Sequence, residues 1–390
     1  MAAAVVLGLF TIVGVELLAR FWIRRRGEHY VFPPGLRLRL LVDREIFPEL
    51  EPEVRFEINS LGERAAEPPR SVEGVYRVLY TGGSQPEAYM LDQRSTPTGA
   101  LQRLLEGPAA CHALGVSTVH VGSICRSGIG SEGLALILTR LLPRYPRLDL
   151  IVVHVGGSDV LRWLERGAPS SMPSPGISDV FRCHPEGPFG LTPGDCAAAE
   201  LLRRTRRRWF RPVDVHHRAG RWYQDVRGMR ARATTIITTM PDPRPMVDAF
   251  GFHLRRVLTA AQAHADRVIV VRQSWFDKEY TAAEAAHMWH GAVGEAWRET
   301  VTTYYSFDVV SGVMALLDER AAAVADELHV EHVDLMTVVG GSLAYYYDWT
   351  HFTPAGARTA AAAIARTILS GRRAAPSSDP LRPCVDLLAS

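Results

Sequence analysis

A continuous apolar run, Leu148–Val155 (LDLIVVHV), constrains the fold more than any other stretch of this 390-residue sequence. Such a strand is expected in a parallel sheet whose two faces are both covered. Other β-rich runs alternate with segments in which apolar residues recur at helical spacing, and this rhythm predicts helices on both faces of the sheet. The sequence therefore predicts a three-layer α/β domain with a flavodoxin-like parallel sheet. The predicted strands are Val75–Tyr80, Val116–Val121, Leu148–Val155, Arg267–Arg272 and His332–Met336.

Composition and charge narrow the class of protein further. A hydrophobic content of 47% is enough for a packed core and excludes a disordered chain. The net charge of +2 and the lack of a nucleic-acid-binding signature give no indication of a nucleic-acid partner. The five cysteines contain no CxxC pair, so neither a zinc site nor a disulfide framework is indicated, although a Cys183–Cys196 bridge stays open. The predicted helices are Thr98–Leu105, Ser131–Leu142, Asp248–His264, Ala282–Tyr304, Val313–Leu328 and one that begins near Pro354.

The N-terminal segment Ala2–Leu18 is almost wholly apolar and is followed by three arginines, Arg24–Arg26. Its length is close to the roughly 20 residues that span a bilayer, so residues 1–26 are predicted to be a membrane anchor. A buried N-terminal helix is the alternative. The arginines after the span favour a cytoplasmic domain, but basic residues upstream of the given start would reverse that argument. The side of the membrane therefore stays open.

The remaining chain divides by composition. Residues 27–70 are predicted to be a connector, 71–370 the α/β domain and 371–390 a C-terminal tail. The α/β rhythm breaks at about 162–233, which is predicted to be an insertion. Within it, Glu200–Arg211 (ELLRRTRRRWFR) is interpreted as a solvated helix face, with a polyanion-binding patch as the alternative.

The first predicted strand leads directly to a candidate nucleophile. Gly82 and Gly83 follow the strand, and this glycine pair lets the backbone turn sharply so that Ser84 is exposed at the strand's carboxyl end. Ligands of open α/β sheets bind at that edge. A helix beginning there would point its amides at a developing negative charge. An ordinary turn with a helix-capping serine is the alternative.

Two glycine-containing segments follow the next two strands. Gly122–Gly133 (GSICRSGIGSEG) lacks the lysine of a phosphate-binding loop, but a glycine amide within it would suit an oxyanion. Gly156–Val160 (GGSDV) offers the Ser158 hydroxyl and the Asp159 carboxylate at the end of the strongest strand.

A carboxylate and an imidazole precede the final predicted helix. Asp348 and His351 are three residues apart, so one turn can bring them together. With Ser84 they supply a nucleophile, a base and an orienting group. Tyr345–Tyr347 are interpreted either as a pocket wall or as core packing. His287 and His290 are interpreted as histidines on a helix face, with a metal-binding pair as the alternative.

The motifs TGGSQ, SGIGSEG, GGSDV and DWTH occur in an order that resembles the SGNH (GDSL-type) hydrolases. The sequence is most similar to bacterial members with an N-terminal membrane helix, in which a segment similar to FEINSLGER precedes the first strand. The resemblance covers about residues 56–370. It implies that Ser84 is the nucleophile, that His351 is the base and that Asp348 orients it. It also implies that Gly128 donates to the oxyanion, with Ser127 or Arg126 as alternatives one or two residues away.

Two positions depart from the family pattern. Gly83 replaces the usual aspartate before the serine, and Ser158 stands where the family has an asparagine whose amide stabilises the oxyanion. A hydroxyl donates one hydrogen bond but is shorter and rotates freely. Loss of one oxyanion donor lowers kcat by about 10²–10³. The serine at position 158 is therefore expected to affect the rate of the reaction more than its type.

The resemblance implies a serine esterase that acts on a small-molecule or glycan ester, such as an acetylated glycan or a lipid. It requires neither a metal nor an organic cofactor, and the expected partners are the substrate and, through the N-terminal helix, a membrane. One alternative is an O-acyltransferase for a cell-envelope glycan. The other is a non-catalytic binding module of the same fold, which Ser158 favours and the combined presence of Ser84, Asp348 and His351 disfavours.

Overall fold

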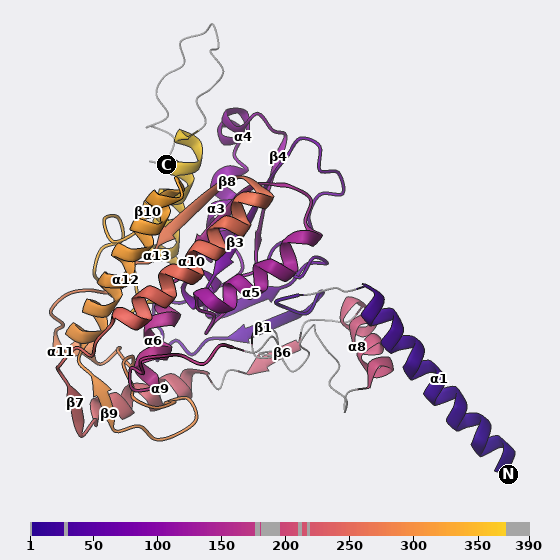
Figure 1. The fold of residues 1–390 in the computed structure, drawn as a ribbon, viewed down its shortest axis with the longest axis horizontal. Helices are drawn as coiled ribbons and strands as arrows, with labels where there is room; N and C mark the ends of the chain where they lie inside the picture. Colours follow the sequence, from indigo (N-terminus) through magenta and orange to yellow (C-terminus); the bar gives the residue numbers. More distant parts are fainter. Residues whose placement is uncertain are drawn as a thin grey trace, which may run out of the picture.

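The computed structural model describes residues 2–26, 30–175, 180, 196–209, 213–216 and 219–371. A five-stranded sheet in the order β4-β3-β5-β8-β10 lies at its centre, and every neighbouring pair is parallel (Figure 1). Counted along the chain from β3, this is the order 2-1-3-4-5 of flavodoxin-like sheets. The predicted fold class and its five strands are therefore confirmed. The strands are β3 (Val75–Gly82), β4 (Thr118–Ser123), β5 (Leu148–His154), β8 (Ala265–Arg272) and β10 (Glu331–Asp334).

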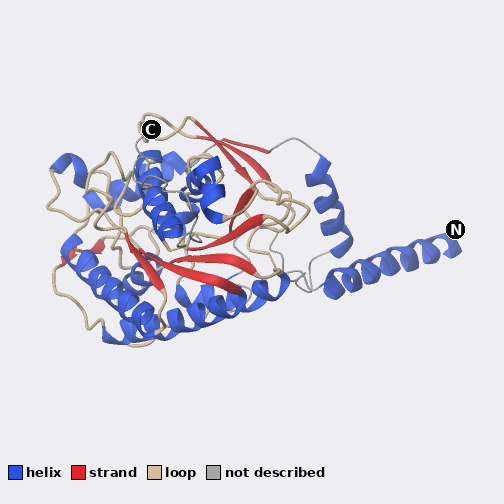
Figure 2. Ribbon diagram, turned by 90° about the horizontal axis from the view of Figure 1, so that it is seen from above, coloured by secondary structure: helices blue, strands red, loops and turns tan. Residues whose placement is uncertain are grey.

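Helices cover both faces of this sheet (Figure 2). On one face α3 packs against α13, and on the other α10 packs between α5 and α12. Because both faces are covered, every residue of β3 is buried, as the apolar sequence of the central strands indicates. These helices confirm most of the predicted ones: α3 (Pro97–Leu105), α5 (Ser131–Leu141), α10 (Arg244–His264), α12 (Phe307–Glu327) and α13 (Pro354–Ser370).

Smaller elements surround the central domain. The segment before β3 forms β1 (Arg37–Leu41) and β2 (Glu53–Glu57), and β1 also pairs with β6 (Val213–His216) from the predicted insertion. A second small sheet pairs β7 (Thr235–Ile237) with β9 (Thr303–Tyr305). The other helices are α2 (Ser84–Glu87), α4 (Pro108–Leu114), α6 (Gly157–Glu165), α8 (Ala197–Trp209), α9 (Ala219–Ala231) and α11 (Ala282–Ala285), and a 3-10 turn spans Leu142–Arg144.

The predicted helix Ala282–Tyr304 is wrong. Helix α11 ends at Ala285, and the chain then runs as a loop to β9. Gly291 and Gly294 in this loop have φ angles of +86° and +117°, which a regular helix does not contain. His287 and His290 therefore lie on a loop and not on the face of a helix.

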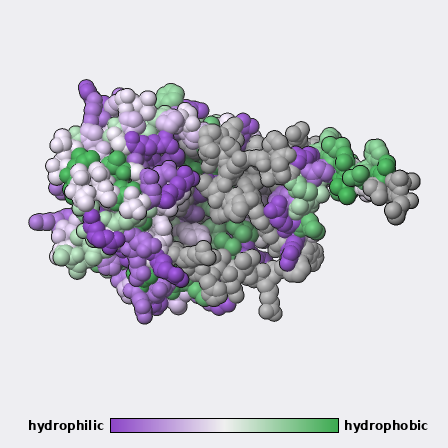
Figure 3. Space-filling model, turned by 90° about the horizontal axis from the view of Figure 1, so that it is seen from below, coloured by the Kyte–Doolittle hydropathy of each residue, from purple (hydrophilic) through white to green (hydrophobic). Residues whose placement is uncertain are grey.

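Helix α1 (Ala2–Arg26) projects away from the domain (Figure 1), and its apolar side chains form a hydrophobic surface (Figure 3). Leu7, Phe10 and Leu18 are each at least 70% exposed. Within the described parts of the chain, no helix meets the length and apolarity needed to cross a bilayer, so the predicted transmembrane helix is not supported. The C-terminal tail, which begins after Gly371, lies outside the described residues. Cys183 also lies outside them.

The acidic residue of α1 binds the start of α8. Glu16 accepts hydrogen bonds from the backbone amides of Ala197 (2.9 Å) and Ala198 (3.0 Å). These amides, together with Cys196 and Arg20, lower the pKa of Glu16 to about 2. A carboxylate at a helix N-terminus is favoured by the unpaired amides there. The contact therefore orients α8 beside α1.

Candidate active site

The glycines before Ser84 allow two strands to come close where the chain turns. A Cβ atom on Gly82 would overlap the carbonyl oxygen of His154 on the neighbouring strand β5. That same oxygen accepts a hydrogen bond from the amide of Gly83 at 3.2 Å. Ser84 then opens helix α2 at the carboxyl end of β3, as the sequence predicts. Its own amide is one of the first in the helix and has no partner within it.

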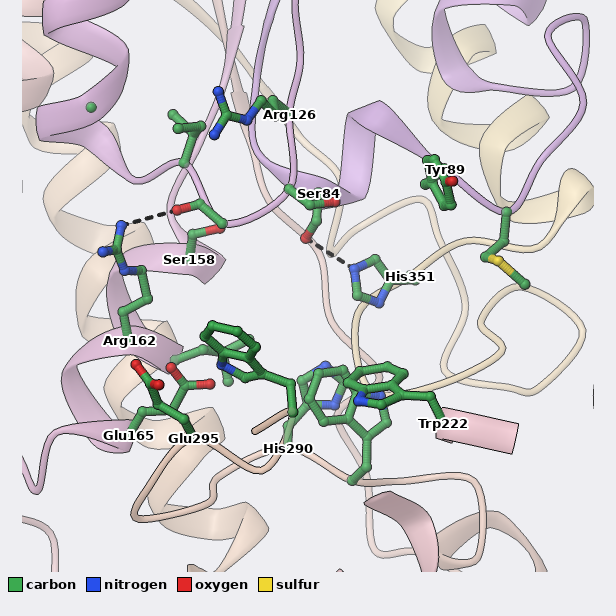
Figure 4. A pocket seen from close by; sticks show the side chains of 18 of the residues that line it. Ser84, Tyr89, Arg126, Ser158, Arg162, Glu165, Trp222, His290, Glu295 and His351 are labelled. Atoms are coloured by element: carbon green, nitrogen blue, oxygen red, sulfur yellow. Dashed lines mark hydrogen bonds between the residues drawn. The ribbon is translucent and has the colours of Figure 1, made fainter. Parts of the chain in front are cut away.

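The predicted serine, histidine and aspartate meet in one row of hydrogen bonds, of which Figure 4 draws the one between Ser84 and His351. The Oγ atom of Ser84 lies 2.9 Å from Nε2 of His351. On the other side of the ring, Nδ1 of His351 lies 2.8 Å from Oδ2 and 3.0 Å from Oδ1 of Asp348. The structure thus brings together residues that are 267 positions apart in the chain.

Asp348 is fully buried yet remains ionised. Burial alone would raise its pKa, but the charge of the His351 ring and the hydrogen bonds from the His351 side chain and backbone amide hold the pKa of Asp348 well below its usual value. The backbone amides of Thr350 and His351 also donate to its Oδ1 atom, at 3.0 and 2.8 Å. An ionised carboxylate at Nδ1 keeps the imidazole proton on that side, which leaves Nε2 free to accept the serine proton.

Of the three amides considered for the oxyanion, only that of Gly128 is free. The Arg126 amide donates to Gly82 at 3.0 Å, and the Ser127 amide donates to Glu87 at 2.5 Å. Gly128 has a φ of +73°, and among the described residues its amide has no hydrogen-bond partner. Its carbonyl accepts from Nη1 of Arg162 at 3.1 Å, which fixes the orientation of this loop (Figure 4).

Ser158 lies close to the predicted nucleophile. It is the second residue of α6, and its Oγ lies 3.3 Å from where a Cβ on Gly83 would be. Within the described chain, no group hydrogen-bonds to this hydroxyl. The neighbouring Asp159 has a different role, because its carboxylate accepts from the amide and the hydroxyl of Ser131 and holds the start of α5. Burial raises the pKa of Asp159 to about 6.

A cavity of about 540 Å³ opens onto Ser84, Gly128, Ser158 and His351. Aromatic and charged side chains line it together (Figure 4). Besides the histidines, the aromatic residues of the lining are Tyr89, Trp222, Tyr223, Trp289, Trp297 and Tyr347, and the charged ones are Arg126, Arg162, Glu165, Arg166 and Glu295. Trp222 and Tyr223 belong to α9, so the predicted insertion supplies part of the cavity wall.

Both interpretations of the tyrosine run hold, for different residues. The Tyr347 ring lies parallel to the His351 ring, with centroids 5.6 Å apart, and lines the cavity. Tyr346 is fully buried and stacks on Phe276 in the core.

Sequence reasoning missed the surroundings of Asp348. His290 is 1% exposed and its Nε2 lies 4.0 Å from Oδ2 of Asp348, while Trp289 donates to the same oxygen at 3.0 Å. Burial lowers the pKa of His290 to about 3, so its ring is neutral. His290, Asp348 and His351 offer donor atoms within 4.8 Å of one another and are the described residues that could hold a metal ion. His287, the other histidine of the metal-binding pair considered as the alternative, is not among them.

A buried network behind Ser84 was also missed. The Gln85 side chain donates to the carbonyls of Ser274 (2.7 Å) and Thr350 (2.5 Å) and pairs with Nε2 of His154 (2.7 Å). Nδ1 of His154 pairs with the Tyr80 hydroxyl at 3.0 Å. Burial lowers the pKa of His154 to about 3 and keeps it neutral. No local sequence pattern indicates these contacts, since their members come from different strands and loops.

Comparison with known proteins gives structural likeness only. No protein-family model matches the chain, and no curated protein matches it significantly. An acetylxylan esterase, Axe2, from Geobacillus stearothermophilus is 11% identical with a TM-score of 0.40, over 75% of this chain and 94% of that one. An aryl esterase from M. smegmatis is 13% identical with a TM-score of 0.39, over 75% and 98%. A carbohydrate acetylesterase family member from Sinorhizobium meliloti is 13% identical with a TM-score of 0.40, over 76% and 99%. At these values the likeness assigns neither a family nor a substrate to this chain.

Proposed function

We propose that this chain is a serine hydrolase of SGNH type that cleaves esters. The observation that carries the proposal is the continuous row of hydrogen bonds from Ser84 through His351 to the ionised Asp348, opening into a cavity. A serine, a base and a buried carboxylate in this geometry are the machinery of acyl transfer through a covalent intermediate.

The geometry supports the following course of reaction. The Ser84 oxygen attacks the ester carbonyl carbon while its proton passes to Nε2 of His351, and Asp348 stabilises the imidazolium that forms. The amides of Ser84 and Gly128 and the hydroxyl of Ser158 donate hydrogen bonds to the negatively charged carbonyl oxygen and stabilise it. His351 then gives its proton to the departing alcohol. A water molecule, deprotonated by His351, attacks the acyl-Ser84 ester, and the acid is released with Ser84 restored.

The cavity supports a small-molecule or glycan ester as substrate. Its volume of about 540 Å³ falls within the range of small-molecule sites. Trp222 and Trp289 offer flat apolar surfaces, and Arg162, Glu165 and Glu295 offer polar contacts in the same cavity.

A fluorophosphonate probe tests the proposal directly, because it labels only an activated serine. The full-length chain in mild detergent is treated with the probe, and the adduct is mapped by mass spectrometry. We expect the label on Ser84 and no label in Ser84→Ala. Ser127→Ala is the matched control, because it removes a nearby hydroxyl that is bound to Glu87, and it should still be labelled. Labelling that persists in Ser84→Ala, or a folded parent that is not labelled, would overturn the proposal.

We also propose that α1 holds the chain at a membrane. The support is the series of exposed apolar side chains along this helix, among them Leu7, Phe10 and Leu18. The test is fractionation of cells that express the full chain or a chain without residues 1–26. The full chain should sediment with membranes and resist a high-salt wash, and the truncated chain should not. A full chain recovered in the soluble fraction contradicts this proposal and leaves the proposed hydrolase activity untouched.

A further inference from the structure

We propose that Trp289 is a positioning residue for the reaction and acts through Asp348. The inference rests on the proposed hydrolase function. The indole Nε1–H of Trp289 donates a 3.0 Å hydrogen bond to Oδ2 of Asp348. The same oxygen accepts the 2.8 Å hydrogen bond from Nδ1 of His351. Trp289 therefore shares the carboxylate oxygen on which the orientation of the base depends.

The two oxygens of Asp348 are held by different groups. Oδ1 accepts from the backbone amides of Thr350 and His351, which belong to the same turn as Asp348. Oδ2 has no backbone donor among the described residues, and Trp289 is the donor to it that comes from outside the turn. A buried carboxylate needs such donors because it is removed from water. The Trp289 bond thus limits rotation of the carboxylate about its axis.

Aromatic packing fixes the direction of this indole. The Trp289 ring stacks on His290, with centroids 3.9 Å apart and an interplanar angle of 29°. The edges of Trp222 and Tyr223 meet it at centroid distances of 5.2 and 6.1 Å. Trp289 itself lies outside any helix or strand, between a turn that ends at Met288 and the bridge of Ala292 with Tyr304, so these ring contacts help to orient its N–H group toward Asp348.

The chemical consequence concerns how the charge of Asp348 is shared. While Trp289 donates to Oδ2, part of the carboxylate's charge is stabilised by the indole. Without that donor, more of the charge acts on the His351 ring and favours its protonated form, which cannot accept the Ser84 proton. The substitution Trp289→Phe removes the N–H group and keeps an aromatic ring in the wall. Six titratable groups act on Asp348 from the surrounding elements and stay in place: His351, His290, His287, Arg227, Tyr223 and Tyr347.

The test is the pH profile of kcat/KM for full-length Trp289→Phe on a short-chain aryl ester. The hydrogen bond from Trp289 to the charged Asp348 helps to stabilise the transition state through His351. We therefore expect its loss to lower kcat/KM on the plateau of the profile about ten-fold. We also expect the acidic limb of the profile to move to higher pH by about half a unit. A shift of this size corresponds to a modest strengthening of the interaction between the Asp348 charge and the protonated His351 ring. The loss should fall mainly on kcat, since an aromatic ring is kept at this position in the cavity lining.

Trp163→Phe is the matched control. Its indole also donates a buried hydrogen bond, to the Pro169 carbonyl at 2.9 Å, but it does not line the cavity that contains Ser84. This variant should lose thermal stability and keep the position of the acidic limb. If Trp289→Phe behaves like Trp163→Phe, with a lower Tm and an unmoved limb, Trp289 is merely structural and the inference is wrong. A parent protein that hydrolyses no ester and takes no fluorophosphonate label would instead defeat the proposed function.

Discussion

The side-chain amide of Gln85 donates a 2.5 Å hydrogen bond to the carbonyl oxygen of Thr350, across 265 positions of the chain. Gln85 follows the proposed nucleophile and Thr350 precedes the proposed base. The distance between Ser84 and His351 is therefore set by a direct contact between their neighbours. Gln273 strengthens this link, because its side chain donates to the Thr350 hydroxyl and accepts from the Gly157 amide, which starts the helix that carries Ser158.

Gln85→Leu should lower both the stability of the protein and its kcat. The change leaves the Ser274 and Thr350 carbonyls and one His154 nitrogen without partners in a buried site. An unsatisfied buried polar group costs about 1–3 kcal/mol, so we expect a loss of about 2–5 kcal/mol in the free energy of unfolding, measured in urea. A loss below 0.5 kcal/mol, as expected of an average surface change, would show that the network is not stabilising.

His351→Ala should reduce kcat on a short-chain aryl ester by several orders of magnitude, because the proton acceptor is lost. Asp348→Asn should cost less, since it removes orientation and charge while Nε2 of His351 remains. The measurement is steady-state kinetics of both variants beside the parent. Activity of His351→Ala equal to that of the parent would rule out the mechanism.

Ser158→Asn and Ser158→Ala should change kcat in opposite directions. The asparagine supplies the amide donor that the SGNH pattern has at this position, and an imperfectly placed donor should still raise kcat about ten-fold. The alanine removes the hydroxyl and should lower kcat with little effect on KM, because the oxyanion exists only near the transition state. If both variants keep the parental kcat and only the melting temperature changes, Ser158 lies outside the oxyanion site.

Glu165 should make the protein less stable as the pH rises. Burial, with a contribution from the charge of Glu295, raises the pKa of Glu165 from 4.5 to about 7, despite the opposing effect of Arg162. The folded state therefore binds more protons than the unfolded state between these values, so the free energy of unfolding falls as pH increases from about 4.5 to 7. Glu165→Gln should abolish this part of the slope and gain about 1–3 kcal/mol on the parent at pH 8. Parallel stability curves for the two proteins would contradict the assignment.

The sheet and the row of three residues could be predicted because each rests on local patterns. A strand buried on both faces reads as a continuous apolar run, as in Leu148–Val155, and chemistry in such a sheet lies just beyond the strand ends. Ser84 and Ser158 follow that rule directly. Asp348 and His351 are three residues apart, so a single turn brings their side chains together.

The aromatic wall could not be predicted in the same way. Trp222 and Trp289 reach the cavity through packing between the insertion and a distant loop, and neither is marked by a local motif. The loop that carries Trp289 was predicted as a helix, but Gly291 and Gly294 have positive φ angles, and Met288 and His290 are buried from an irregular backbone.

Helix α9 couples the lining of the cavity to the proposed catalytic row. The residues that would break the ester bond come from the ends of the central strands and the last loop, whereas Trp222 and Tyr223 come from a segment inserted between two strands. The same helix also contacts the surroundings of the row, because Arg227 donates to the carbonyl of Tyr347 at 2.9 Å and the rings of Trp222 and Tyr223 pack on Trp289. A change in α9 that reshapes the cavity for another ester should therefore alter the support of Asp348 as well, so that substrate preference and rate change together.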